Sequence, residues 1–162
     1  MQKASQVGYI DVAFGLRLRT LALKNSTYPD NLSIKASEEA RTAGNAMSQS
    51  YGLLNIKALC DFMDIVWNSQ YKYLIKPVCS IHDANYFEIP NTIGAIKFVN
   101  DNLIACMEWQ DLPELKHDSI HLGGELDVFY SGWDRPITIP NSVNSKEIKE
   151  IILREVNKYD NK

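Results

Sequence analysis

The stretch "KPVCSIHDANYFEI", Lys76 to Ile89, places a His-Asp dipeptide between two arms rich in apolar and β-branched residues. Such arms predict two short strands, with His82 and Asp83 at the bend between them. A carboxylate at the tip of a hairpin is rigidly aimed and would suit Mg²⁺, which usually takes one or two protein carboxylates. An aspartate in a turn more often bonds its own backbone, and a single histidine more often lies in or near a core. Both interpretations of the dipeptide stay open at this point.

Size and composition predict a single domain. The 162 residues, 45% of them hydrophobic, are ample for one packed core and few for two. The chain has neither a basic-then-apolar amino-terminal segment nor a run of about eighteen apolar residues, so we expect a soluble, cytoplasmic protein. Cys60, Cys79 and Cys106 are widely spaced and odd in number. We therefore expect reduced, buried thiols rather than disulfides or a zinc site.

Charge is unevenly spread along the chain. The formal net charge is −3, but residues 1–80 hold nine Lys/Arg against six Asp/Glu, and residues 81–162 hold eight against fourteen. This skew suits a protein that touches a polyanion with one surface only. Ordinary solvated faces would explain it about as well.

Hydrophobic periodicity predicts an α+β fold. "GYIDVAFGLRLRT", Gly8 to Thr20, alternates as a hairpin does. Ser37, with two glutamates behind it, predicts the cap of a long helix that runs to about Asn68. A second helix follows Thr92, and "GGELDVFYSGW" predicts a further strand. We expect a small antiparallel sheet with helices packed on one face, plus a C-terminal amphipathic helix.

The tail, residues 135–162, differs in character from residues 1–134, and we treat it as a separate segment. Ser145 is the expected cap of its helix. Apolar residues then fall on one face of this charged helix: Ile148, Ile151, Ile152, Val156 and Tyr159. That face must dock either on this chain or on a partner.

A polar stripe runs along the long predicted helix. Arg41, Asn45 and Gln49 recur at i, i+4 and i+8, and we expect the side-chain-free Gly52 on the same side. Arg can clamp phosphate, while Asn and Gln suit base edges in a minor groove. The alternative is a solvated helix face. Another candidate, a metal pair formed by His117 and His121, has no third ligand at an obvious spacing.

Four segments together resemble family A DNA polymerases, the class of bacterial DNA polymerase I and several phage replicative enzymes. "RTAGNAMSQ", Arg41 to Gln49, looks like the family's R-x-x-x-N-x-x-x-Q helix, and "SIHDANYFEI", Ser80 to Ile89, looks like its third motif, a hairpin carrying His-Asp-Glu. "GYIDVAFGLRLRT" is similar to the hairpin before that helix. "GGELDVFYSGW" is similar to the short strand and Gly-x-x-Trp region near the family's carboxyl end. The resemblance covers roughly Gly8 to Trp133.

The resemblance implies a role for each matched residue. Asp83 would be one of two palm aspartates that bind catalytic Mg²⁺, and His82 would sit by the primer terminus. Arg41, Asn45 and Gln49 would track primer-template DNA in its minor groove. In the family, two metal ions support the transfer of a nucleotide from a dNTP to a primer 3′ end.

Two departures from the family shape the expectation. Ala84 stands where the family has Glu, and the first motif, with its metal-binding aspartate, and the second, the nucleotide-binding helix, are absent. We therefore expect the chain to be inactive alone. We expect it to be the C-terminal palm portion, residues 1–134, of a split phage-type polymerase, in the host cytoplasm if phage-encoded. An N-terminal polymerase polypeptide would supply the other motifs and share two Mg²⁺ ions. The alternative is a non-catalytic palm remnant that binds primer-template DNA or a replication protein.

Overall fold

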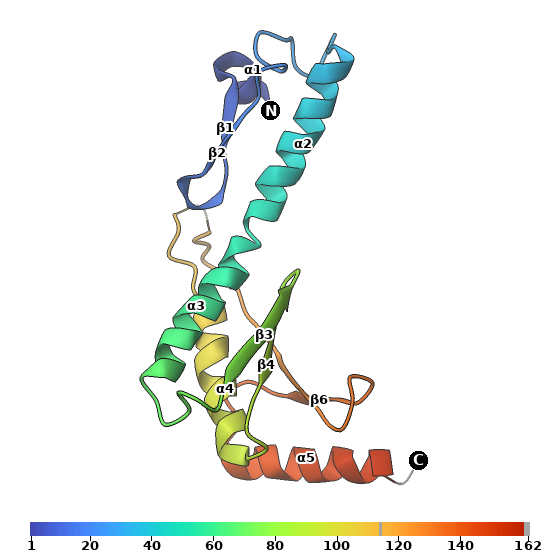
Figure 1. Ribbon diagram of the computed structural model, residues 1–162. Helices are drawn as coiled ribbons and strands as arrows, with labels where there is room; N and C mark the ends of the chain where they lie inside the picture. Colours follow the sequence, from blue (N-terminus) through green and yellow to red (C-terminus); the bar gives the residue numbers. More distant parts are fainter. Residues whose placement is uncertain (114, 161–162) are drawn as a thin grey trace. The chain divides into compact units, whose positions relative to one another are not determined.

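A computed structural model describes residues 1–113 and 115–160 of the chain (Figure 1). The chain divides into two compact units, Met1–Leu54 and Asn55–Lys162. The fold is mixed α+β, which confirms the expected class. In the part of the chain that the structure describes, the strands form three separate two-stranded antiparallel sheets rather than the single small sheet that we expected. Within the described residues, no helix is long and apolar enough to cross a membrane.

The first unit begins with a short helix and the predicted hairpin. Helix α1 (Gln2–Val7) leads into β1 (Tyr9–Asp11), which pairs antiparallel with β2 (Arg17–Arg19). The Nε of Arg17 donates to Asp11 Oδ1 at 2.8 Å, and its guanidinium lies 3.8 Å from the centroid of the Tyr9 ring. The predicted hairpin is confirmed, and the Arg17 cation already has an internal partner.

Helix α2 (Ile34–Ser50) carries the predicted polar stripe. Its cap is Ser33, whose Oγ accepts from the Ala36 amide at 3.2 Å. The prediction that Ser37 caps the helix is therefore wrong, because Ser37 already donates its amide to the Ser33 carbonyl as part of the first turn. The buried face of α2 consists of alanines, which pack with residues of α1, β1 and the following loop: Ala36, Ala43, Ala4, Ile10 and Leu23. Small side chains let the hairpin lie close beside α2 (Figure 1).

The long helix predicted to reach Asn68 is two helices. A turn at Tyr51 and Gly52 separates α2 from α3 (Leu53–Trp67). The Gly52 amide bonds to Gln49 O at 2.9 Å, three residues back instead of the four of an α-helix. Glycine favours this break because it stabilises a helix interior poorly. Gly52 therefore lies outside α2, and the expectation that it shares the polar stripe is wrong.

The second unit packs two helices with a hairpin. Strands β3 (Lys76–Ile81) and β4 (Ala84–Glu88) form the predicted hairpin, and α4 (Ile93–Met107) begins after Thr92, whose Oγ1 accepts from the Ala95 amide. The core between them holds mostly large apolar side chains: Phe62, Met63, Val66, Ile75, Val99 and Leu103. Cys60 and Cys79 are exposed, so the expectation of buried thiols is wrong for these two.

The tail docks on its own chain. Strand β5 (Leu126–Phe129), which was predicted, pairs with β6 (Pro136–Ile139), which was not. Helix α5 (Ser145–Asp160) then packs its apolar face against α4 and β6, with Ile148 fully buried. The cap of α5 is Asn144, whose Oδ1 accepts from the amides of Lys146 and Glu147, rather than Ser145.

Candidate functional site

The His82-Asp83 dipeptide forms the whole turn of the β3–β4 hairpin, because Ile81 pairs directly with Ala84. His82 has φ of 53°, whereas Asp83 is not among the residues with positive φ. A type II′ turn has this pattern, and its first position usually holds glycine. Non-glycine residues in such conformations cluster at functional sites, where the strain is tolerated.

The side chains of this turn have no internal partners. His82 and Asp83 are both exposed, and neither side chain forms a hydrogen bond or ion pair with any residue in the described ranges. A turn aspartate ordinarily bonds to the nearby backbone. Asp83 instead leaves both carboxylate oxygens free for an external ligand.

A network of side-chain amides lies just behind the turn. Asn55, in the first turn of α3, and Asn85, on β4, pair reciprocally through their side chains. The Asn85 Nδ2 donates to Asn55 Oδ1 at 2.7 Å, and the Asn55 Nδ2 donates to Asn85 Oδ1 at 3.2 Å. Asn55 also donates to Ser80 Oγ on β3, and Asn85 donates to the Asn55 carbonyl. Both strands of the hairpin are thus tied to α3.

Aromatic rings continue from β4 into the β5–β6 loop. Tyr86 stacks on Trp133 with ring centroids 4.8 Å apart, and Phe129 stacks on the same indole at 5.5 Å. Trp133 nevertheless keeps 65% of its surface exposed. The hairpin is therefore supported near its turn by the Asn55–Asn85 amide pair and, farther from the turn, by the stacked rings around Trp133.

The polar stripe of the first unit is on α2 as predicted. Arg41, Asn45 and Gln49 are all exposed, and within the described part of the chain their side chains have no hydrogen-bond or ion-pair partners. At a rise of 1.5 Å per residue, the stripe is about 12 Å long. That length matches three to four base steps of about 3.4 Å. The stripe lies in the first unit, whereas His82 and Asp83 lie in the second.

The described residues bring together only small sets of side chains that could bind a metal ion. Among the described residues, no group of three or more His, Cys, Asp or Glu side chains could hold a metal ion. His117 and His121 lie in an irregular segment, not on a helix, and His117 Nδ1 accepts from the amides of Ser119 and Ile120. The two histidines therefore do not lie on one helix, which removes the helical spacing on which that candidate depended. Asp83 fits Mg²⁺ as a single hard oxygen ligand, and a complete centre needs ligands from elsewhere.

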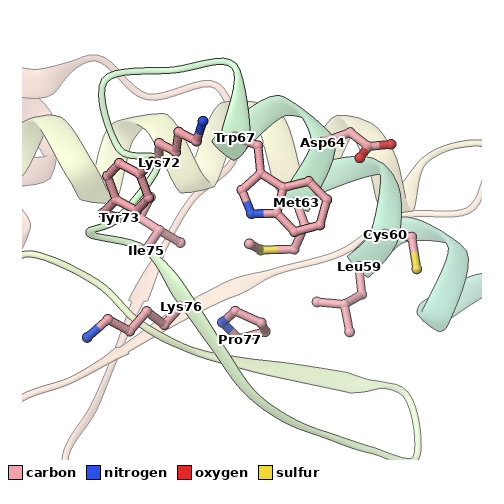
Figure 2. A pocket seen from close by; sticks show the side chains of 10 residues that line it. All are labelled: Leu59, Cys60, Met63, Asp64, Trp67, Lys72, Tyr73, Ile75, Lys76 and Pro77. Atoms are coloured by element: carbon pink, nitrogen blue, oxygen red, sulfur yellow. The ribbon is translucent and has the colours of Figure 1, made fainter.

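An apolar hollow of about 580 Å³ opens on the second unit (Figure 2). Met63 and Ile75 are buried at its floor, while Trp67 and Tyr73 stand at its sides with 55% and 79% of their surfaces exposed. Figure 2 shows Lys72 and Lys76 on the same side as Tyr73, and Asp64 beyond Trp67. Large exposed aromatic side chains around an apolar floor are typical of an interaction surface.

Comparisons with protein-family models, with curated proteins and with solved structures found no match. The geometry of the chain's own residues therefore carries the functional argument. Sequence reasoning missed Asn55, Ser80 and Asn85. The available signal was a pair of asparagines at positions where the helix and strand patterns call for apolar side chains.

Proposed function

We propose that this chain is the C-terminal subunit of a split DNA-directed DNA polymerase and completes a palm by assembling with a polypeptide that carries the upstream motifs. The observation that carries the proposal is the unpartnered Asp83 carboxylate at the tip of a tight, strained turn. A purely structural turn residue would bond the backbone beside it. An aspartate that projects without an internal partner is suited to hold an external cation.

The polar stripe supports a DNA-facing role for the first unit. Three long polar side chains in register, with no internal partners, can contact primer-template DNA over about three to four base steps. Arg41 would contact phosphate or a base edge, and the two amides would meet the acceptors of the minor groove. The unit is also mildly basic, with six Lys/Arg against four Asp/Glu in residues 1–54.

Mg²⁺ would be held at Asp83 together with ligands of the partner polypeptide. Bound there, the metal would supply charge stabilisation for nucleotidyl transfer from a dNTP. This chain's own contribution is to aim one carboxylate, to place His82 beside the primer end and to hold the primer-template. It is therefore expected to be inactive alone.

The apolar hollow supports assembly with another polypeptide. Trp67 and Tyr73 expose large aromatic areas beside a buried apolar floor, and both residue types dominate the energetics of protein interfaces. The apolar face of α5, in contrast, is already occupied within this chain. Deleting residues 145–162 would therefore disrupt the core of the second unit, so surface substitutions in the hollow are the cleaner probe of assembly.

Primer extension tests the catalytic assignment. The full-length chain is used to recover its polymerase partner from the native source, and the assembly is supplied with primer-template, dNTPs and Mg²⁺. Asp83→Ala should reduce extension at least about 100-fold, a loss typical of removing transition-state charge stabilisation. Asp118→Ala, which removes an exposed loop carboxylate, serves as the matched control. Unchanged extension by the Asp83 variant would rule out the assignment.

Binding of primer-template by the chain alone tests the stripe. Arg41→Gln should weaken binding and lower the slope of log K against log salt by about one phosphate equivalent. Lys35→Gln removes an equal charge from the same helix but lies off the stripe. Equal losses from the two variants would mean that net charge, not the stripe, determines binding.

A second candidate is a non-catalytic palm remnant that binds primer-template DNA or a replication protein. Ala84 in place of the family's glutamate favours it, because it leaves Asp83 as the only carboxylate of the turn. This candidate requires that the stripe variant weaken DNA binding while the Asp83 variant leaves extension unchanged. A neighbouring reading frame that encodes the upstream motifs would favour the split enzyme.

A further inference from the structure

On the β3 side, the β3–β4 hairpin has few of the features that usually set strand register. Five of the six residues of β3 are exposed, so this strand has little buried face to select its pairing, whereas β4 is half-buried and packs Phe87 against the core. A bulge interrupts the ladder between Pro77 and Cys79. The turn is His-Asp rather than a glycine-containing pair, so turn chemistry favours the observed register only weakly. The packing of Phe87 is therefore the main apolar contribution to the alignment, and polar contacts can add to it.

The Asn55–Asn85 pair supplies that specification. Asn55 is buried, with 8% of its surface exposed, and its side-chain oxygen and nitrogen are both used by hairpin residues. Asn85 and Ser80 face each other across the hairpin, one rung from the pair that closes the turn. Asn55 therefore forms hydrogen bonds with both strands of the hairpin at one cross-strand pair, Ser80 and Asn85.

A one-residue slip would break this arrangement. It would turn Asn85 toward the opposite face of the hairpin and remove Ser80 from its partner, because side chains alternate along a strand. The Asn55 amide would then be buried without partners, which costs about 1–3 kcal/mol for an unsatisfied group. An apolar pair at these positions would pack in more than one register without such a penalty.

We infer that Asn55, Ser80 and Asn85 form a register lock that fixes the position of the His82-Asp83 turn. They are positioning residues, because their side chains bond to one another across α3 and both strands and act through the turn. The functional part of this inference rests on the proposed function, since the direction of the Asp83 carboxylate matters only if it holds a ligand. The structural part can be tested on the full-length chain alone.

The test is the nuclear magnetic resonance spectrum of the full-length chain. The amides of His82 and Asp83 should each give one resonance in the wild type, with cross-strand contacts between Ser80 and Asn85. Asn55→Leu and Asn85→Leu should each give multiple or broadened turn resonances. Amide exchange in the hairpin should also become roughly 5- to 150-fold faster, as expected for losing a buried amide pair. Asn102→Leu, which removes an amide bonded to Phe98 O on α4, is the matched control.

Two further variants keep the test decisive if a single leucine destabilises the unit. Asn55→Leu/Asn85→Leu leaves no unpaired amide and should fold, yet its turn resonances should remain multiple because no hydrogen bond selects the register. Ser80→Ala removes one hydrogen bond and should give a smaller effect of the same kind. Single, unshifted turn resonances with intact cross-strand contacts in both variants would overturn the lock.

Primer extension separates failure of the lock from failure of the proposed function. In the assembled enzyme, the double variant should lower kcat while leaving the KM for primer-template near its wild-type value, because the α2 stripe is untouched. If Asp83→Ala abolishes extension and the double variant does not alter kcat, the lock has no role in positioning. If Asp83→Ala has no effect, the proposed function fails, and the spectra still decide whether the lock exists.

Discussion

At the scale of single residues, Asp83 and His82 differ from ordinary turn residues because their side chains do not bond to the nearby backbone. Neither side chain bonds to the hairpin that carries it, and His82 adopts a backbone conformation that glycine would adopt more readily. Retaining histidine there is unfavourable for the turn by itself. The strain is consistent with a side chain whose contribution lies outside the fold.

His82→Gly separates these two contributions. A left-handed conformation costs a non-glycine residue about 1–2 kcal/mol, and the extra chain entropy of glycine offsets about 0.5–1 kcal/mol of that. The free energy of unfolding should therefore stay unchanged or rise by up to about 1.5 kcal/mol in a chemical denaturation experiment. Primer-template affinity or extension should fall if His82 meets the primer end. A clear loss of stability would mean that the histidine ring supports the turn.

The three cysteines should differ in reactivity, because Cys106 is half-buried and the other two are exposed. Burial, and then the nearby Asp61 carboxylate, raise the pKa of the Cys106 thiol. At pH 8 a smaller fraction of Cys106 is therefore thiolate than for a thiol with an ordinary pKa, and only the thiolate reacts. Iodoacetamide should therefore modify the exposed Cys60 and Cys79 faster than the half-buried Cys106, as measured by peptide mass spectrometry. A raised pKa also means that the Cys106 rate should keep increasing above pH 9, whereas a rate equal to those of the exposed thiols would contradict the burial.

At the scale of elements, short polar residues decide where helices begin and end. Ser33, Thr92 and Asn144 each accept backbone amides of the following first turn. The mistaken caps, Ser37 and Ser145, lie four residues and one residue beyond the true ones. Their composition is suitable, but a cap must precede the first helical residue, and another suitable residue stood upstream in each case.

Ser33→Ala tests the cap of α2. Removing the side-chain acceptor should lower the free energy of unfolding by about 1 kcal/mol, within the usual range for a serine cap. Ser37→Ala is the matched control and should change it by less than about 0.5 kcal/mol, because alanine is a good helix former and this side chain is exposed. Thermal or urea unfolding followed by circular dichroism measures both. A larger effect from Ser37 would restore it as the cap.

At the scale of the whole molecule, the two units differ in the size of their hydrophobic cores. The second unit holds two clusters of large buried side chains, and its tail helix covers one of them. The first unit is built around alanines with a few larger residues. Small domains with little buried apolar area are marginal in isolation.

A fragment of residues 55–162 should therefore fold alone. We expect a cooperative unfolding transition and slow amide exchange in α4, because both core clusters lie within it. A fragment of residues 1–54 should be much less stable, with a weak or absent transition. Circular dichroism melts of the two fragments measure this difference, and an unfolded 55–162 fragment would show that its cores depend on the first unit.

Several features follow from local signals, namely alternation, helical spacing and capping chemistry. They are the two predicted hairpins, β1–β2 and β3–β4, the start of α4 after Thr92, the amphipathic face of α5 and the position of His82-Asp83 at the bend. The sequence alone determined these features because each depends on residues only a few positions apart. The same holds for the stripe of Arg41, Asn45 and Gln49, whose spacing places it on one face of any helix.

Tertiary structure decided the features that join distant residues. Asn55 meets Asn85 thirty positions away, and the apolar face of α5 packs on α4 and β6. No local pattern selects which buried amide another amide will meet, because that choice depends on three-dimensional packing and on the cost of leaving a polar group unpaired. The exposed Asp83 is thus a local feature, while the network that would hold it in place exists only in the folded chain.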